Sequence, residues 1–248
     1  MAIFGRKKVA APAGPSNPSN NNDKHPGHAA VLHHLRAEEQ ADPGVRERLA
    51  GAVIFDLACQ LLNSERGVRM EDLLAMLASV AGHACIAPFL TRLAVGATPE
   101  QLGLTVVKGN DGRYYFFGDP PNRLLAESSD SVISLAFGAA QALGARVTVE
   151  MIGDEMAKVA KRVGGPDFET LDLPPGHMTD RPTEWARVFR AKLSEALDLY
   201  EVPPMRRACA LGYAIQKAMD AGRDSIDPMM AAQIVLQCAT RTAKVTLA

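Results

Sequence analysis

Apolar residues recur at helical spacing along most of the chain. The clearest case lies near 149–163, where one side of a helix would carry Val149, Ile152, Met156, Val159 and Val163. Acidic residues begin this segment and basic residues end it, which matches the helix dipole. The same periodicity predicts further helices at about 28–40, 43–63, 68–81, 130–144, 182–200, 204–221 and 228–241, and one that ends near Gly96 after a break at Gly82-His83.

Two of these helices have a strong start signal in the sequence. At Asp42-Pro43 and again at Asp227-Pro228, an aspartate that can cap a helix precedes a proline. Proline suits the first helical position because its missing N–H would have no helical partner there. The last helix is apolar over much of its circumference, so we expect it to be buried.

One segment departs from the helical pattern, the aromatic run VVKGNDGRYYFFGDPPN at residues 106–122. Asp111-Gly112 lies between two apolar stretches and predicts a two-residue type I′ hairpin turn. In that register Val107 faces Phe116, and both faces of the hairpin carry apolar side chains. A two-stranded hairpin is marginal in water, so we expect this one to be covered by helices or shared across a dimer.

These elements predict a mainly α protein. We expect an orthogonal multi-helix bundle of about eight or nine helices with one β-hairpin near 104–117. Residues 1–26 are rich in Pro, Asn and Ser and contain few apolar side chains, which is typical of a disordered arm. Residues 27–248 would then form a single helical domain that contains the hairpin.

Charge and composition exclude several kinds of partner. The chain has 27 basic and 28 acidic residues and a net charge of −1, so nothing drives it toward nucleic acid or an anionic membrane. Its N-terminus lacks the apolar stretch of a secretory signal. The uncharged run at 73–91 is long enough to suggest a membrane span, but Gly82, His83 and Pro88 interrupt it. Two buried helices that meet at a break explain it better, and we expect no membrane span.

Four cysteines lie far apart, without a CxxC pair, inside apolar helical stretches. Buried, reduced thiols in a cytoplasmic protein are the simplest interpretation. His83 and Cys85 are two residues apart and would point in different directions on a helix, so they do not make a nucleophile and base pair. The sequence has no dinucleotide, P-loop, zinc-protease or hydrolase motif, so we expect no cofactor and assign no catalytic residue.

Histidines are concentrated near the N-terminus, at His25, His28, His33 and His34. No carboxylate or thiol accompanies them at ligand spacing, so we do not expect a metal site there. Metal handling by these histidines nevertheless stays open as a minor alternative.

The polar residues where the aromatic strand ends are the best candidates for contact with a ligand or partner. Prolines stiffen the loop between Asp119 and Asn122, and Arg113 and Arg123 flank it, so an anionic ligand is conceivable. Hydrogen bonds from the side chains of Asp119 and Asn122 to their own backbone are the favoured alternative. The full set of candidate contact residues is Arg113, Tyr115, Phe117, Asp119, Asn122, Arg123 and His177.

Three segments, DGRYYFFGDPPNRLL, FGAAQALGA and GYAIQKAMDAGRDSIDPMMAAQIVLQCA, resemble segments of a family of uncharacterised bacterial cytosolic proteins. The resemblance extends from about Val45 to the C-terminus. It implies a bacterial, cytosolic setting and brings no activity, cofactor or functional residue.

We therefore expect a non-enzymatic interaction or assembly module that self-associates or binds a protein partner. The hairpin and the 118–123 loop would form its contact surface, because the hairpin is apolar on both faces. The alternative is a small-molecule-binding protein or enzyme whose pocket lies between the 118–123 loop and the 164–181 loop.

Overall fold

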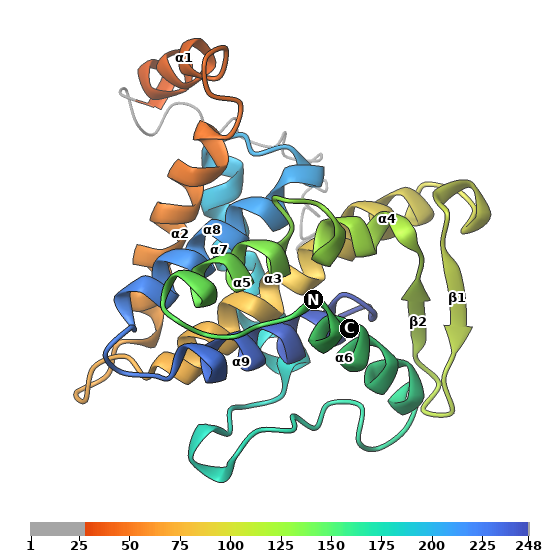
Figure 1. Ribbon diagram of the computed structural model, residues 1–248. Helices are drawn as coiled ribbons and strands as arrows, with labels where there is room; N and C mark the ends of the chain where they lie inside the picture. Colours follow the sequence, from red (N-terminus) through yellow and green to blue (C-terminus); the bar gives the residue numbers. More distant parts are fainter. Residues whose placement is uncertain (1–27, 248) are drawn as a thin grey trace, which may run out of the picture.

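The computed structural model describes residues 28–247 and confirms a mainly α fold with one antiparallel hairpin (Figure 1). The predicted arm at 1–26 and His25 lie outside the described residues. The main helices are α1 (His28–Glu38), α2 (Val45–Leu62), α3 (Met70–Ala94), α5 (Val132–Ala142), α6 (Val149–Arg162), α7 (Pro182–Leu199), α8 (Arg207–Ala221) and α9 (Pro228–Thr242). The strands are β1 (Thr105–Lys108) and β2 (Tyr114–Phe117), and the short helical turns are η2 (Glu100–Leu102), α4 (Asp119–Asn122), η3 (Arg123–Glu127), η4 (Pro175–His177) and η5 (Pro204–Arg206).

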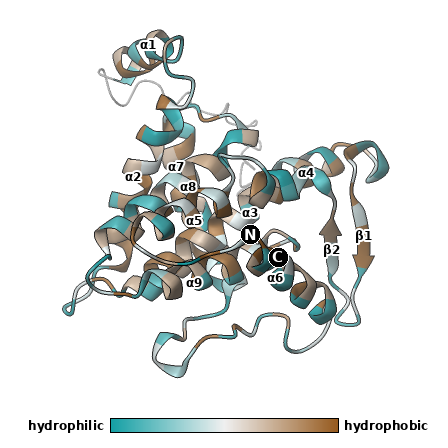
Figure 2. Ribbon diagram, viewed as in Figure 1, coloured by the Kyte–Doolittle hydropathy of each residue, from teal (hydrophilic) through white to brown (hydrophobic). Residues whose placement is uncertain are grey.

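Helix α3 is at the centre of the fold and packs against α7, α8 and α9. Every residue from Leu73 to Ile86 is buried, so the helix is covered all round its first four turns. Helix α9 is buried along most of its length, as its apolar circumference predicts. Figure 2 shows the apolar residues concentrated in the middle of the bundle and along both strands.

The predicted break at Gly82-His83 is wrong, because α3 is one continuous helix. Gly82 lies where α3 crosses α9, and a Cβ there would overlap the Ala239 carbonyl oxygen and the Thr242 hydroxyl. Its small size therefore serves a close helix crossing. Within residues 28–247, α3 is the one helix long and apolar enough to span a membrane, but 78% of its most apolar window is buried inside the fold.

The start signals on the two aspartates have different outcomes. The Asp227 carboxylate caps α9 as predicted, since its Oδ1 accepts from the backbone N–H of Met229 at 2.9 Å and of Met230 at 3.0 Å. Asp42 instead accepts from the N–H of Gly44 at 3.3 Å, and α2 begins one residue later, at Val45.

The hairpin exists, but its predicted register is wrong by one residue. Val107 pairs with Tyr115 rather than Phe116. The loop has three residues, Asn110-Asp111-Gly112, because the Gly109 N–H donates to the Arg113 carbonyl at 2.9 Å. Gly112 has φ +80°, as expected for a type I turn followed by a left-handed residue.

On each face of the hairpin one aromatic side chain is buried within the same chain, while Val107 and Tyr114 stay exposed. Phe116 packs with Ile86, Phe89, Leu102 and Leu104 near the end of α3. On the other face the partners of Tyr115 are Val159, Phe168 and Val245. The C-terminal segment also extends the sheet, since the N–H of Phe116 donates to the Lys244 carbonyl at 2.8 Å. Helices and the C-terminal segment therefore supply much of the cover that the sequence demanded.

The 118–123 segment is not the loop expected from its prolines. It forms the short helix α4, with Pro120 and Pro121 in its first turn, and leads directly into η3. These residues lie at the base of the hairpin, whereas residues 110–112 form its tip (Figure 1).

Candidate functional site

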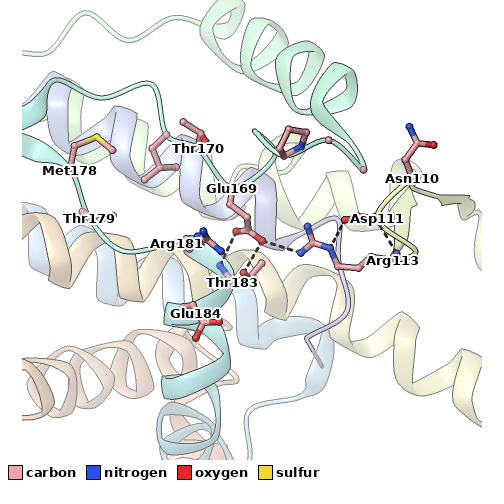
Figure 3. Close-up of a pocket in the computed structure, with 14 residues that line it drawn as sticks. Asn110, Asp111, Arg113, Glu169, Thr170, Met178, Thr179, Arg181, Thr183 and Glu184 are labelled. Atoms are coloured by element: carbon pink, nitrogen blue, oxygen red, sulfur yellow. Dashed lines mark hydrogen bonds and ion pairs between the residues drawn. The ribbon is translucent and has the colours of Figure 1, made fainter.

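A polar groove of about 780 Å³ lies between the hairpin tip and the chain that leads from α6 into α7 (Figure 3). We call it the tip groove. Asn110, Asp111 and Arg113 line it from the tip, residues 164–166, 169–171, 178–179 and 181 from the connecting segment, and Thr183 and Glu184 from the first turn of α7. Two segments that are distant in the sequence, the hairpin tip and the stretch from 164 to 184, therefore form one concave surface.

A buried arginine on α9 holds the connecting segment in place. Arg241 is 0% exposed and donates to the carbonyls of Phe168 at 3.0 Å and Thr170 at 2.9 Å. Its Nη1 forms an ion pair of 2.5 Å with Glu155 of α6. A buried guanidinium needs its charge paired and its N–H groups hydrogen-bonded, so this arrangement ties the groove wall firmly to the core.

The hairpin tip reaches the same wall through two glycines. A Cβ on Gly109 would lie 2.8 Å from the Cα of Gly164, and one on Gly164 would lie 2.6 Å from the backbone N of Asn110. The two backbones therefore touch, and both positions require glycine. This contact brings the tip against the end of α6.

Asp111, Arg113 and Glu169 form an ionic chain across the groove (Figure 3). Arg113 donates from Nε to Asp111 at 2.6 Å and from Nη1 to Glu169 at 3.1 Å. Glu169 also accepts from the Thr183 hydroxyl at 2.8 Å. Burial disfavours the charged guanidinium, but its hydrogen bonds to the two carboxylates outweigh that and raise the pKa of Arg113. These interactions therefore connect the hairpin tip to the first turn of α7.

The aromatic rings of Tyr115 and Phe168 pack against the Arg113 guanidinium. The Arg113 guanidinium lies 5.7 Å from each ring centroid, and the Tyr115 hydroxyl donates to Asp111 at 2.7 Å. Burial raises the pKa of Asp111, but the hydrogen bonds from Arg113 and Tyr115 lower it by more. The pKa is therefore lowered overall, and the carboxylate stays charged.

Other polar groups in the groove have no such partner. Within residues 28–247, the side chains of Asn110, Thr170 and Arg181 form no hydrogen bond or ion pair, and all three are exposed. Glu184 is paired outward with Arg187 at 2.6 Å. Arg181 is thus the one cation lining the groove that forms no ion pair in the described part of the chain, and its charge adds to the hydrogen bond and charge of Arg187 in lowering the pKa of Glu184.

Of the predicted contact residues, only Arg113 lines the groove. Tyr115 is 0% exposed, so its predicted role as a contact residue conflicts with its burial. His177 Nδ1 lies 2.8 Å from Glu71 Oε1, at hydrogen-bonding distance, and this contact joins η4 to the start of α3 outside the groove lining.

Phe117 and Asn122 both contact the side chain of Lys244. The Lys244 ammonium donates to Asn122 Oδ1 at 2.6 Å and lies 5.4 Å from the Phe117 ring centroid. Lys244 is 3% exposed, and burial lowers its pKa to about 8. Asn122 therefore anchors the C-terminal segment. Its side-chain oxygen accepts from Lys244 rather than from its own backbone, which was the favoured prediction.

Asp119 and Arg123 are exposed on α4 and η3, at the opposite end of the hairpin from the groove. The tip groove is a different site, because there the 164–181 segment meets the hairpin at its tip. A pocket between the 118–123 and 164–181 segments stays a prediction. The residues that sequence reasoning missed are Asn110, Asp111, Glu169, Arg181 and Thr183. Asp111 has a local signal only as part of the Asp111-Gly112 turn, and Arg181 only as the residue before the proline that begins α7.

No family model matches this chain. No curated protein and no solved structure matches it either.

No group of three His, Cys, Asp or Glu side chains between 28 and 247 could hold a metal ion. Cys85 and Cys238 are fully buried, and burial raises the pKa of each thiol to about 12, so neither forms a thiolate readily.

Proposed function

We propose that this protein binds a small polar ligand in the tip groove. The observation that carries the proposal is the contrast within the groove between paired and unpaired charges. Asp111, Arg113 and Glu169 satisfy one another, whereas the Arg181 guanidinium faces the groove and forms no ion pair among residues 28–247. An acidic group on the ligand would complete that pairing.

The rest of the groove favours a hydroxylated body on that ligand. The Asn110 amide and the Thr170 hydroxyl both donate and accept hydrogen bonds and have no side-chain partner in the described part of the chain. Large apolar side chains are nearly absent from the lining, with Leu171 and Met178 the exceptions. A hydroxylated carboxylate, such as a sugar acid, has the matching chemistry.

Binding is favoured over acid–base catalysis because the carboxylates that line the groove, Asp111, Glu169 and Glu184, are each paired with an arginine. It is favoured over assembly because Tyr115 and Phe116, on the two apolar faces that suggested self-association, are buried by the chain itself. Self-association through the hairpin stays a prediction.

The test is a thermal-shift and calorimetric titration with gluconate, and with sorbitol as the uncharged counterpart of the same chain length. We expect gluconate to raise the melting temperature by mass action and sorbitol to have no effect. Arg181→Gln should abolish the gluconate effect. Arg146→Gln is the matched control, because Arg146 is exposed in another loop and outside the groove.

Equal responses to gluconate in the wild type and the Arg181→Gln variant would contradict the proposal. So would the absence of saturable binding by gluconate and by other hydroxylated carboxylates.

A further inference from the structure

A second cavity, of about 310 Å³, lies between α3, α7 and the start of α8. We call it the α3–α7 cavity. Its apolar wall includes Val80, Leu197 and Leu211, and its polar groups include His83, Arg190 and Arg207. No carboxylate lines it. At ~30 Å³ per water it has room for a small organic molecule, and its lining is distinct from that of the tip groove.

His83 is a buried polar group without a partner. It is 8% exposed, lines the cavity, and forms no hydrogen bond within residues 28–247. The His83 ring nitrogens are not among the fully enclosed side-chain atoms that lack a hydrogen-bond partner, so they are accessible from the cavity and can hydrogen-bond to a ligand there. Burial, aided by the positive charge of Arg190, lowers the pKa of His83 to about 4. The ring is therefore neutral at pH 7 and donates one N–H.

Arg190 lies on α7 across the cavity from α3 and is likewise unpaired within the described range. Arg207 is held at the cavity edge, since it pairs with Asp198 and donates from Nε to the Val202 carbonyl at 3.3 Å. Arg190 is thus the free cation of the cavity, and a guanidinium binds a carboxylate through two parallel hydrogen bonds.

The helix geometry disfavours a multiply charged anion. Pro88 has no N–H, so the Ala84 carbonyl lacks its usual helical donor, and both residues line the cavity. A wall carbonyl oxygen without that donor would repel a phosphate dianion more strongly than a monoanion. A single carboxylate near Arg190 with an apolar body against the wall avoids that repulsion.

We propose that the α3–α7 cavity binds a compact organic monocarboxylate. Its carboxylate pairs with the Arg190 guanidinium and accepts from the His83 ring N–H. Its apolar body packs against Val80, Leu197 and Leu211. This proposal is independent of the tip groove, with which the cavity shares no lining residue.

The experiment is isothermal titration of the full chain with butyrate, hexanoate and benzoate at pH 7. Hexanamide has the size of hexanoate without the charge, and inorganic phosphate has the charge without the apolar body. We expect saturable binding of at least one carboxylate, at least tenfold weaker binding of hexanamide, and none of phosphate. Arg190→Gln should weaken carboxylate binding at least tenfold, and His83→Gln to a smaller extent.

Arg187→Gln is the matched control, because Arg187 lies one turn earlier on α7 and is 54% exposed. It should bind carboxylates as the wild type does. Circular dichroism of each variant verifies the fold. The proposal is overturned if no carboxylate binds saturably, if Arg190→Gln binds as the wild type does, or if phosphate or hexanamide binds as tightly as hexanoate. The Arg181→Gln variant should bind these carboxylates normally, so failure here is distinct from failure at the tip groove.

Discussion

Arg241 and Glu155 form an ion pair of 2.5 Å in the interior of the fold, with side chains 0% and 5% exposed. The pair joins α9 to α6. Because Arg241 also donates to the carbonyls of Phe168 and Thr170, the same guanidinium positions one wall of the tip groove.

Glu155→Ala should strongly destabilise the protein, because it leaves the Arg241 charge buried without its partner. Removal of one member of a buried pair costs about 3–5 kcal/mol. Urea denaturation measures the loss. Asp154→Ala, at the exposed neighbouring position, should change the free energy of unfolding by less than about 0.5 kcal/mol. Equal urea midpoints for the two variants would show that the buried ion pair does not stabilise the fold.

Gly82→Ala should destabilise the crossing of α3 and α9, because the new methyl group overlaps the Ala239 carbonyl. Overpacking of this kind costs about 1–3 kcal/mol. Gly138→Ala on α5 is the control, since a Cβ there meets nothing within 4 Å. It should stabilise the helix by about 0.5–1 kcal/mol. A gain in thermal stability for both variants would contradict the close crossing.

Unfolding should depend on pH through His83, whose pKa falls from 6.5 to about 4 in the folded state. Between these values the unfolded chain binds a proton that the folded chain does not, so the free energy of unfolding falls as the pH falls from 6.5 to 4. The shift corresponds to about 3 kcal/mol. The wild type should lose that much relative to His83→Gln when urea titrations at pH 7 and pH 4 are compared. A constant difference between the two proteins would refute the assignment.

Tyr115→Ser should lower the free energy of unfolding by about 3–5 kcal/mol, as expected for loss of a buried aromatic side chain. Tyr114→Ser should leave it nearly unchanged, because Tyr114 is 51% exposed. Light scattering on the same variants tests self-association. A lower oligomeric mass for Tyr114→Ser, with stability intact, would support assembly through the hairpin.

Helix positions followed from local sequence. The apolar stripe on α6 and the Asp227 cap of α9 depend on residues within a turn or two of each other, so a pattern along the chain is enough to predict them. The length of the hairpin loop was less well determined by local sequence. Asp111-Gly112 suits a two-residue loop and also a three-residue loop with Gly112 in the left-handed region, and the packing of Tyr115 and Phe116 against separate clusters selects the second.

Local patterns along the chain are enough to predict a mainly helical protein, the approximate ends of most helices and an apolar hairpin that needs cover. Each of these depends on short-range periodicity, capping or the cost of exposing apolar surface. The close helix crossing at Gly82, the contact of Asn122 with Lys244 and the groove at the hairpin tip become visible only in the folded chain. Those outcomes depend on contacts such as that of Arg113 with Glu169, which are 56 residues apart and leave no periodic signal in the chain.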